Sequence, residues 1–239
     1  GIGKGIAIRY AQEGAAVVLA SRSLDILEAV AADIRKEGGR ALALELDVMR
    51  YESVEHAVAR TVEAFGRLDV IVNNAGISMA RPSEELAPAD WQRALDTDLS
   101  GVFYGCQCAA RQMLRQESGG CIINITSTYG LVAAPGRVAY CASKAAVNMM
   151  TKVLAIEWAK RKIRVNAIAP GYIRTELVQG VIDSGMLQLD AIEKRTPLGR
   201  IGEVPELLGI AVHLACDESS FMTGSVVSVD GGWEAYGYL

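Results

Sequence analysis

The chain has 239 residues, of which 51% are hydrophobic and 22% charged; this composition excludes a disordered or fibrous protein and suits one folded domain. The 24 basic and 28 acidic side chains give a formal net charge of −4, which argues against a general binder of nucleic acid or acidic membranes, because such binders need a net basic face. Every strongly apolar stretch is broken well before the ~18 residues that a membrane-spanning helix needs, so we expect no membrane partner.

The first part of the chain alternates short apolar runs with amphipathic stretches, a pattern typical of βαβ units. Ile26, Val30 and Ile34 recur at helical spacing, and Gly38 follows where a helix would end. In chain order, the sequence predicts a helix at 1–14, a strand at 15–21, a helix at 24–37, a strand at 41–47, a helix at 53–65 and a strand at 69–74.

The second part of the chain continues the same alternation. It predicts one or two helices at 91–117, a strand at 120–127, a helix at 139–160, a strand at 163–169, a polar excursion at 171–202, a helix at 204–216 and a strand at 225–229. Neither a linker nor a repeat interrupts the pattern. We therefore expect a single α/β domain over residues 1–239, with a substrate loop at about 172–202. Its fold is a Rossmann-type doubly wound parallel sheet in three αβα layers.

The start of the chain is unusual for such a fold. A doubly wound sheet places its phosphate-binding turn between the first strand and the first helix, so a helix that begins at Gly1 should follow a strand. We therefore expect a longer polypeptide in which a central first strand precedes Gly1, and we expect a protein that truly began at Gly1 to fold poorly.

Cysteine and histidine usage indicates neither disulfides nor a metal site. The five cysteines are odd in number and lack CxxC spacing, so we expect buried thiols in a reducing cytoplasm. The two histidines, His56 and His213, lie in helical patterns, and we expect both to be far from any ligand partner. A histidine metal site or a Ser-His-Asp triad is therefore not expected.

A tyrosine and a lysine four residues apart form the strongest local motif. On a helix, Tyr140 and Lys144 project from one face, and an adjacent cation favours the phenolate, so we predict a pKa for Tyr140 below its usual value of about 10. Such a tyrosine can exchange a proton with an alcohol or carbonyl near neutral pH. The motif alone is weak, because many surface helices carry such a pair by chance.

A serine upstream strengthens this interpretation. Ser127 ends an apolar strand, at the carboxyl edge where α/β sheets bind ligands, and its hydroxyl can hold the reacting oxygen against Tyr140. Alone, Ser127 would equally well be a residue that terminates a strand. Together with Tyr140 and Lys144 it indicates a hydride-transfer site.

These residues and several others stand in the order and spacing of the short-chain dehydrogenase/reductase family, which the whole chain resembles. The motifs that carry the resemblance are Gly1-Ile2-Gly3, Asp47-Val48, Asn73-Asn74-Ala75-Gly76, Ser127, Tyr140-x-x-x-Lys144 and Pro170-Gly171. The resemblance implies a Rossmann fold, a nicotinamide cofactor and reversible oxidation of a secondary alcohol. Gly1 and Gly3 match the last two glycines of the family's Thr-Gly-x-x-x-Gly-x-Gly turn.

The resemblance also implies which residues contact the dinucleotide. Glycines let backbone N–H groups approach a pyrophosphate at a helix N-terminus. The expected contacts are Gly1, Ile2 and Gly3 at the pyrophosphate, Asp47 and Val48 at the adenine, Asn74, Ala75 and Gly76 at the adenosine ribose, Tyr140 and Lys144 at the nicotinamide ribose, and Pro170, Gly171, Ile173 and Thr175 around the carboxamide.

Charge after the second expected β-strand of the fold indicates the cofactor. An acidic residue there binds the 2′-hydroxyl of NAD, whereas a basic residue accommodates the 2′-phosphate of NADP. Here the strand runs into Ser21 and Arg22, and the first carboxylate is Asp25. Arg22 offers a charged donor fork suited to phosphate, so the sequence favours NADP over NAD. The alternative is that Arg22 is only a solvated turn residue.

One position departs from the family pattern. Where the family often has an asparagine that steadies a water in the proton relay, this chain has Asp98. A carboxylate can accept a hydrogen bond from that water but cannot donate one unless it is protonated. Two alternatives stay open: Asp98 serves the relay in altered form, or it packs a helix and only Ser127, Tyr140 and Lys144 are catalytic.

The substrate is less well indicated. Expected pocket walls are residues 78–81, 129–137, Tyr172 and 176–198, and the stretches 154–159 and 166–175 are similar to sugar-acid and polyol dehydrogenases such as the gluconate 5-dehydrogenases. An aromatic cluster in the tail, residues 231–239, is more typical of packing or subunit contact than of substrate contact, although it could reach a neighbour's site.

We therefore expect an NADP-preferring oxidoreductase acting on the secondary alcohol or ketone of a sugar, sugar acid or polyol. A 3-oxoacyl-thioester reductase is the alternative within the family, although the sequence shows no clear arginine patch for an acidic carrier protein. A non-catalytic cofactor sensor or interaction protein is the alternative of another class, and the intact Ser127, Tyr140 and Lys144 weigh against it. The resemblance further implies a homotetramer built through the two long helices and through the last strand with its neighbouring helix.

Overall fold

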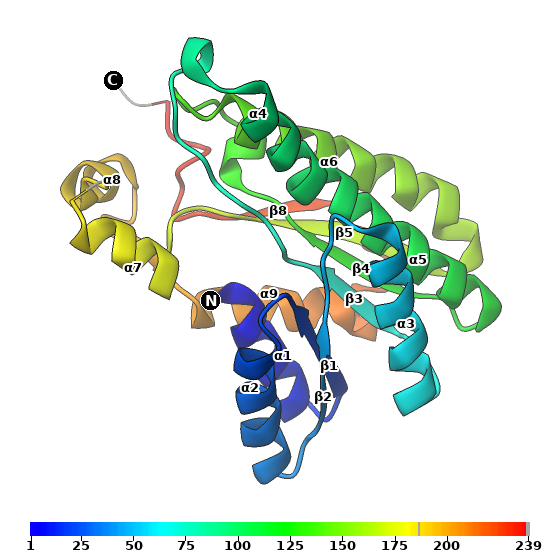
Figure 1. Ribbon diagram of the computed structural model, residues 1–239. Helices are drawn as coiled ribbons and strands as arrows, with labels where there is room; N and C mark the ends of the chain where they lie inside the picture. Colours follow the sequence, from blue (N-terminus) through cyan, green and yellow to red (C-terminus); the bar gives the residue numbers. More distant parts are fainter. Residues whose placement is uncertain (186, 238–239) are drawn as a thin grey trace.

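Helices and parallel strands alternate along the chain in the computed structural model, which describes residues 1–185 and 187–237 (Figure 1). The strands are β1 (Ala16–Ser21), β2 (Arg40–Glu45), β3 (Val70–Asn73), β4 (Gly120–Ile125), β5 (Ile163–Pro170), β6 (Ile173–Arg174), β7 (Gly202–Glu203) and β8 (Val226–Val229). The α-helices are α1 (Ile2–Gln12), α2 (Leu24–Lys36), α3 (Tyr51–Phe65), α4 (Pro88–Leu95), α5 (Gly101–Arg115), α6 (Val138–Trp158), α7 (Glu176–Asp183), α8 (Leu189–Arg195) and α9 (Pro205–Ala215).

The long strands form two parallel groups. One is a four-stranded sheet in the order β3-β4-β5-β8, and the other is the pair β1-β2. Helix α1 packs against both groups, since Ile6 joins the apolar cluster of β4 and β5 while Ala7 and Ile8 pack against the cluster of β1.

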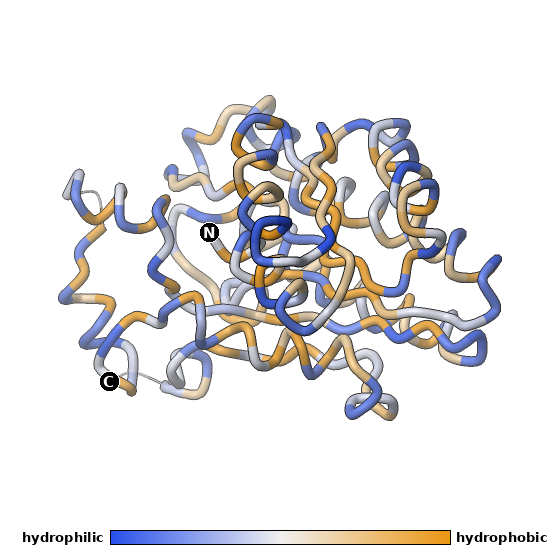
Figure 2. Tube along the Cα trace, turned by 90° about the horizontal axis from the view of Figure 1, so that it is seen from below, coloured by the Kyte–Doolittle hydropathy of each residue, from blue (hydrophilic) through white to orange (hydrophobic). Residues whose placement is uncertain are grey.

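The four-stranded sheet is covered on both faces. Consecutive residues of a strand point to opposite sides, and Ile122 and Ile123 of β4 accordingly lie in different core clusters. The cluster around Ile122 is completed by α5 and α6, and the cluster around Ile123 by α1 and α9. Figure 2 shows hydrophobic and hydrophilic stretches alternating along the helices, as expected when one side of each helix faces a sheet. The predicted doubly wound, three-layer α/β fold is confirmed.

A buried polar network ties the centre of the sheet to the helices that carry the site. The Asn73 amide donates to Asn124 Oδ1 at 2.9 Å, and the Asn124 amide donates to Thr151 Oγ1 of α6 at 2.9 Å. The Cys106 thiol of α5 also donates to Asn124 Oδ1, at 3.4 Å. Since buried amides must be hydrogen-bonded, this network fixes α6 against β4 and so sets the position of the residues at their ends.

All five cysteines are free, but the prediction that they are buried is wrong for two of them. Cys106, Cys108 and Cys121 are buried, whereas Cys141 and Cys216 are half-buried. None of the helices that the structure describes combines the length and the apolar character needed to cross a bilayer.

Candidate active site

The predicted catalytic residues meet at the carboxyl edge of the four-stranded sheet. Ser127 lies two residues beyond the end of β4, and Tyr140 and Lys144 lie one turn apart in α6. Asp98 lies in a π-helical turn, residues Asp96–Ser100, that joins α4 to α5. The edge is where ligands bind in open α/β sheets, because the loops after parallel strands gather there.

Ser127 is positioned to donate a hydrogen bond to the reacting groups. Its Oγ accepts the backbone N–H of Tyr129 at 3.1 Å, which occupies an acceptor site and leaves the hydroxyl proton free. The Ser127 side chain lies close enough to the phenol of Tyr140 to lower its pKa, that is, to favour the phenolate. Ser127 and Tyr140 are thus neighbours at this edge of the sheet.

The predicted lowering of the pKa of Tyr140 is wrong for this structure. Burial raises the pKa of the Tyr140 phenol above its usual value and outweighs the hydrogen bond from Ser127 and the charge of Arg137, both of which lower it. The charge of Asp98 raises it further. Lys144 does not offset the burial, because its ammonium lies over the tyrosine ring, 5.6 Å from the centroid, and donates to the carbonyl of Ile125 at 3.2 Å.

Lys144 and Asp98 form a buried pair of ionisable groups behind the tyrosine. Burial lowers the pKa of Lys144 and raises that of Asp98, while the attraction between the two charges opposes both shifts. Asp98 Oδ1 accepts the backbone N–H of Ile77 at 2.7 Å, and Oδ2 has no partner among the described residues. A Cβ on Gly76 would lie 3.3 Å from Lys144 Nζ and 3.4 Å from Asp98 Oδ1. A glycine at this position therefore leaves room for the Lys144 and Asp98 side chains.

The N-terminus of α1 fits an anionic group such as a pyrophosphate. Gly1 precedes the first turn, is exposed and has no side chain that could cap the helix. The first N–H groups of α1 therefore have no intrahelical partner and can bind an anion. The first turn contains no acidic residue that would repel an anion. A Cβ on Gly3 would lie 2.7 Å from the amide nitrogen of Asn74, so Gly3 and Ile2 begin the helix against the end of β3.

The other expected cofactor residues follow the same edge. Arg22 is exposed just beyond β1, and Ser21 Oγ accepts the N–H of Ser23 at 3.2 Å. Asp47 Oδ1 accepts the backbone N–H of Met49 at 3.1 Å. Val48 packs against Gly101, since a Cβ added to Gly101 would lie only 3.0 Å from the Val48 side chain. The predicted ribose residues, Asn74, Ala75 and Gly76, are exposed.

The loop after β5 is held rigidly. Gly171 donates its N–H to Val229 at 3.0 Å, directly after the buried Pro170. Ile173 points into the core, so only its backbone can face a ligand, and Thr175 Oγ1 accepts the N–H of Val178 to cap α7. Together, the glycine cradle, the open helix N-terminus and the exposed polar edge fit a dinucleotide.

Sequence reasoning expected Tyr129 and Tyr172 in the pocket walls but did not foresee that Trp233 of the tail joins them in one aromatic cluster beside Ser127. Tyr129, Tyr172 and Trp233 come from the loops after β4, β5 and β8, with ring centroids 5.4 to 6.3 Å apart. The hydroxyls of Tyr129 and Tyr172 lie 3.0 Å apart, and Arg195 stacks 4.7 Å above the Trp233 ring. Trp233 of the tail therefore packs against the loops after β4 and β5 of its own chain.

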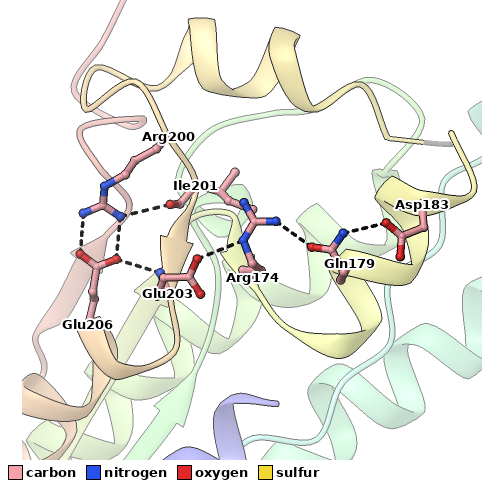
Figure 3. A network of polar contacts seen from close by, with 7 residues as sticks. All are labelled: Arg174, Gln179, Asp183, Arg200, Ile201, Glu203 and Glu206. Carbon is pink, nitrogen blue, oxygen red and sulfur yellow. Dashed lines mark hydrogen bonds and ion pairs between the residues drawn. The ribbon is translucent and has the colours of Figure 1, made fainter.

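A polar network anchors the expected substrate loop at its base (Figure 3). Arg174 bonds Glu203 Oε1 at 3.0 Å and Gln179 Oε1 at 2.7 Å, which ties β6 to β7 and to α7. Arg200 forms a bidentate pair with Glu206, which holds the pKa of that carboxyl at about 2. The loop is thus attached to α9 by charges that persist at any physiological pH.

The expectation that both histidines lie far from ligand partners is wrong for His213. The nitrogen of His213, the thiol of Cys216 and the carboxylate of Glu218 lie within 4.8 Å of one another, because α9 ends there and the chain turns back. His213 Nδ1 lies 3.8 Å from Glu218 Oε2.

Comparisons with known proteins agree on the kind of chain. Residues 1–234 match the family model described as enoyl-(acyl carrier protein) reductase. The chain is 37% identical over 232 residues to the 3-oxoacyl-[acyl-carrier-protein] reductase of Thermotoga maritima, covering 97% of this chain and 93% of that protein.

Two solved structures are similar throughout. A short-chain type dehydrogenase/reductase from Mycobacterium marinum has a TM-score of 0.94 and 40% identity, and covers 99% of this chain and 92% of its own. A gluconate 5-dehydrogenase from Burkholderia cenocepacia, solved in complex with NADP and tartrate, has a TM-score of 0.93, 38% identity and the same coverage. The substrates in these names differ, so similarity alone does not specify one.

Proposed function

This chain belongs to the short-chain dehydrogenase/reductase family and is a nicotinamide-dependent oxidoreductase acting on CH–OH groups; on that premise, we propose that it prefers NADP and interconverts the secondary alcohol and ketone of a sugar, sugar acid or polyol. The observation that carries the proposal is the meeting of Ser127, just beyond the end of β4, with Tyr140 and the buried Lys144 of α6 at the carboxyl edge of the sheet. A protein that only bound a cofactor would gain nothing from this arrangement.

In the proposed mechanism, Ser127 donates a hydrogen bond to the substrate oxygen and holds it against the Tyr140 phenol. During alcohol oxidation, Tyr140 takes the hydroxyl proton as the carbinol carbon loses a hydride; during ketone reduction, it gives the proton to the carbonyl oxygen. A bound nicotinamide supplies the hydride acceptor or donor. Lys144 would bind the nicotinamide ribose, and its Nζ lies 5.6 Å from the centroid of the Tyr140 ring.

For Asp98 we favour a positioning role over direct proton transfer. Its Oδ1 holds the backbone at Ile77, and its charge acts on Lys144 across the space beside Gly76. Asp98 Oδ2, which has no partner among the described residues, can accept a hydrogen bond from a water. The proposal is therefore also compatible with a proton relay in which Asp98 holds that water.

Support for the substrate class and the cofactor comes from the site and from one relative. Three aromatic residues with two hydroxyls suit a polyhydroxylated ligand, since such rings offer an apolar face and polar tips. The gluconate 5-dehydrogenase was solved with NADP and with tartrate, a hydroxylated acid. We also propose that the enzyme works in the cytoplasm, where a reducing compartment keeps its five thiols free.

Turnover of a defined substrate panel tests the proposal. Absorbance of the reduced cofactor is followed with NADPH or NADP and a panel of sugars, sugar acids, polyols and 3-oxoacyl thioesters. We expect the sugar acids or polyols to give the highest kcat/KM. A preference for 3-oxoacyl thioesters would support the alternative within the family, for which the similarity to the Thermotoga protein speaks. Cofactor binding without turnover of any compound would indicate a sensor.

We further propose that the protein forms a homotetramer that uses the outer face of α6. Met149, Val153 and Ile156 lie at helical spacing on this face and are 59%, 44% and 79% exposed. A contiguous apolar stripe on a long helix is typical of a subunit interface.

Replacing Ile156 by glutamate is expected to shift the mass in solution from four chains to two or one, because a charge would be buried in the interface. Light scattering after size-exclusion chromatography measures the mass. Ile26→Glu is the matched control, since Ile26 is 67% exposed on α2. A single-chain mass for the unmodified protein, or an unchanged mass for the Ile156 variant, would contradict the proposed interface.

A further inference from the structure

An arginine beside Tyr140 has no acidic partner among the residues that the structure describes. Arg137 immediately precedes α6, is half-buried, and lies close enough to lower the pKa of both Tyr140 and Tyr129. Within the part of the chain that the structure describes, Arg137 forms no ion pair. A partly desolvated guanidinium is a favourable binding site for an anion, because the anion compensates the lost hydration.

The surroundings of Arg137 hold its side chain in place without neutralising it. Its Nη1 donates to Ser78 Oγ at 2.6 Å, and its guanidinium carbon lies 5.9 Å from the centroid of the Tyr129 ring. Burial and the hydrogen bond with Tyr172 raise the pKa of Tyr129, so this phenol stays neutral. The remaining N–H groups of the guanidinium are therefore available to an external anion.

The positions of Arg137 and the aromatic cluster define where such an anion would lie. Tyr129 links the two, since its ring neighbours both the Arg137 guanidinium and the rings of Tyr172 and Trp233. The residues that would hold the reacting oxygen lie next to these side chains. Ser127 Oγ accepts the backbone N–H of Tyr129, and Arg137 lies close enough to Tyr140 to lower its pKa. A molecule bound at Ser127 could thus place a carboxylate at Arg137 and its hydroxylated carbons along the aromatic rings.

We propose that Arg137 is the carboxylate-binding residue of the substrate site, which makes hydroxy acids and their keto forms the substrates of this enzyme. The inference rests on the proposed function and narrows its substrate class to acids, because a planar guanidinium forms paired hydrogen bonds with a carboxylate that a neutral polyol cannot replace. The acid is held by its charged end while the chemistry occurs at its alcohol carbon.

The experiment compares each acid with its uncharged amide. Gluconate with gluconamide and 3-hydroxybutyrate with 3-hydroxybutyramide differ mainly in charge, and sorbitol serves as a neutral polyol. We expect the unmodified enzyme to prefer the acid of at least one pair, and Arg137→Gln to raise the KM for that acid about 10- to 100-fold with little change in kcat. Activity on neutral compounds should change little, and Arg137→Lys should recover part of the loss. Arg60→Gln removes a charge from an exposed residue of α3 and is the matched control.

Three outcomes would overturn the inference. Equal use of acid and amide by the unmodified enzyme would remove the need for a carboxylate site. An unchanged KM in Arg137→Gln would exclude Arg137 from binding. An equal loss of kcat on acids and neutral alcohols, with a displaced pH profile, would mean that Arg137 acts on Tyr140 instead. In each case, the proposed function would still hold if the unmodified enzyme oxidised neutral alcohols. Only the absence of turnover with every compound would refute the proposed function itself.

Discussion

Replacing Tyr140 by phenylalanine is expected to lower kcat by a factor of about 10² to 10⁴, because the variant keeps the ring but cannot give or take the proton at the substrate oxygen. Neither Ser127 nor Lys144 can substitute, since the serine hydroxyl only holds the oxygen and Lys144 Nζ donates to Ile125 while lying over the tyrosine ring. Initial rates from absorbance of the reduced cofactor, with the best substrate of the panel, measure the loss.

The variant should otherwise behave like the parent protein. A shift in thermal unfolding on addition of NADPH should persist, which separates lost chemistry from lost cofactor binding. Tyr51→Phe removes the same atom from a tyrosine of α3 that contacts Arg111, and it should retain the parent rate. Turnover that survived Tyr140→Phe would refute the mechanism.

The fold could be predicted from the sequence because its strands are continuous apolar runs. The β4 run, with Ile122 and Ile123 facing opposite clusters, is typical of a strand buried on both sides. Boundaries differ by up to three residues, because the ends of helices and strands depend on local hydrogen bonds that composition does not specify. The π-helical turn at Asp96–Ser100 was not predicted, since an inserted residue in a helix changes the apolar period very little.

The site could be predicted only as far as topology determines it. Ser127 follows a central strand and Tyr140 begins the next helix, so their approach follows from the fold. The pKa of Tyr140 could not be predicted, because its sign depends on burial as well as on the neighbouring charge. The joining of Tyr129, Tyr172 and Trp233 was also beyond reach, since three loops distant in sequence bring these rings together.

Arg22 is expected to determine the choice between the two nicotinamide dinucleotides. It lies exposed just beyond β1, and no carboxylate precedes Asp25 in this turn to repel a 2′-phosphate. The unmodified enzyme should therefore prefer NADPH to NADH. Arg22→Ala should lower kcat/KM for NADPH about 10- to 100-fold and leave that for NADH almost unchanged, since hydrogen bonds to a charged group contribute roughly 1.5–3 kcal/mol.

The loss of kcat/KM for NADPH should depend on the position of the arginine that is removed. Arg40→Ala is the matched control, because Arg40 is also exposed but pairs in register with Ala16, at the amino end of the β1-β2 pair and thus opposite Arg22. Rising ionic strength should weaken NADPH binding more than NADH binding in the parent protein and not in Arg22→Ala, because an exposed ion pair is screened by salt. A preference of the unmodified enzyme for NADH would refute the assignment, since a 2′-phosphate in contact with Arg22 could only favour NADPH.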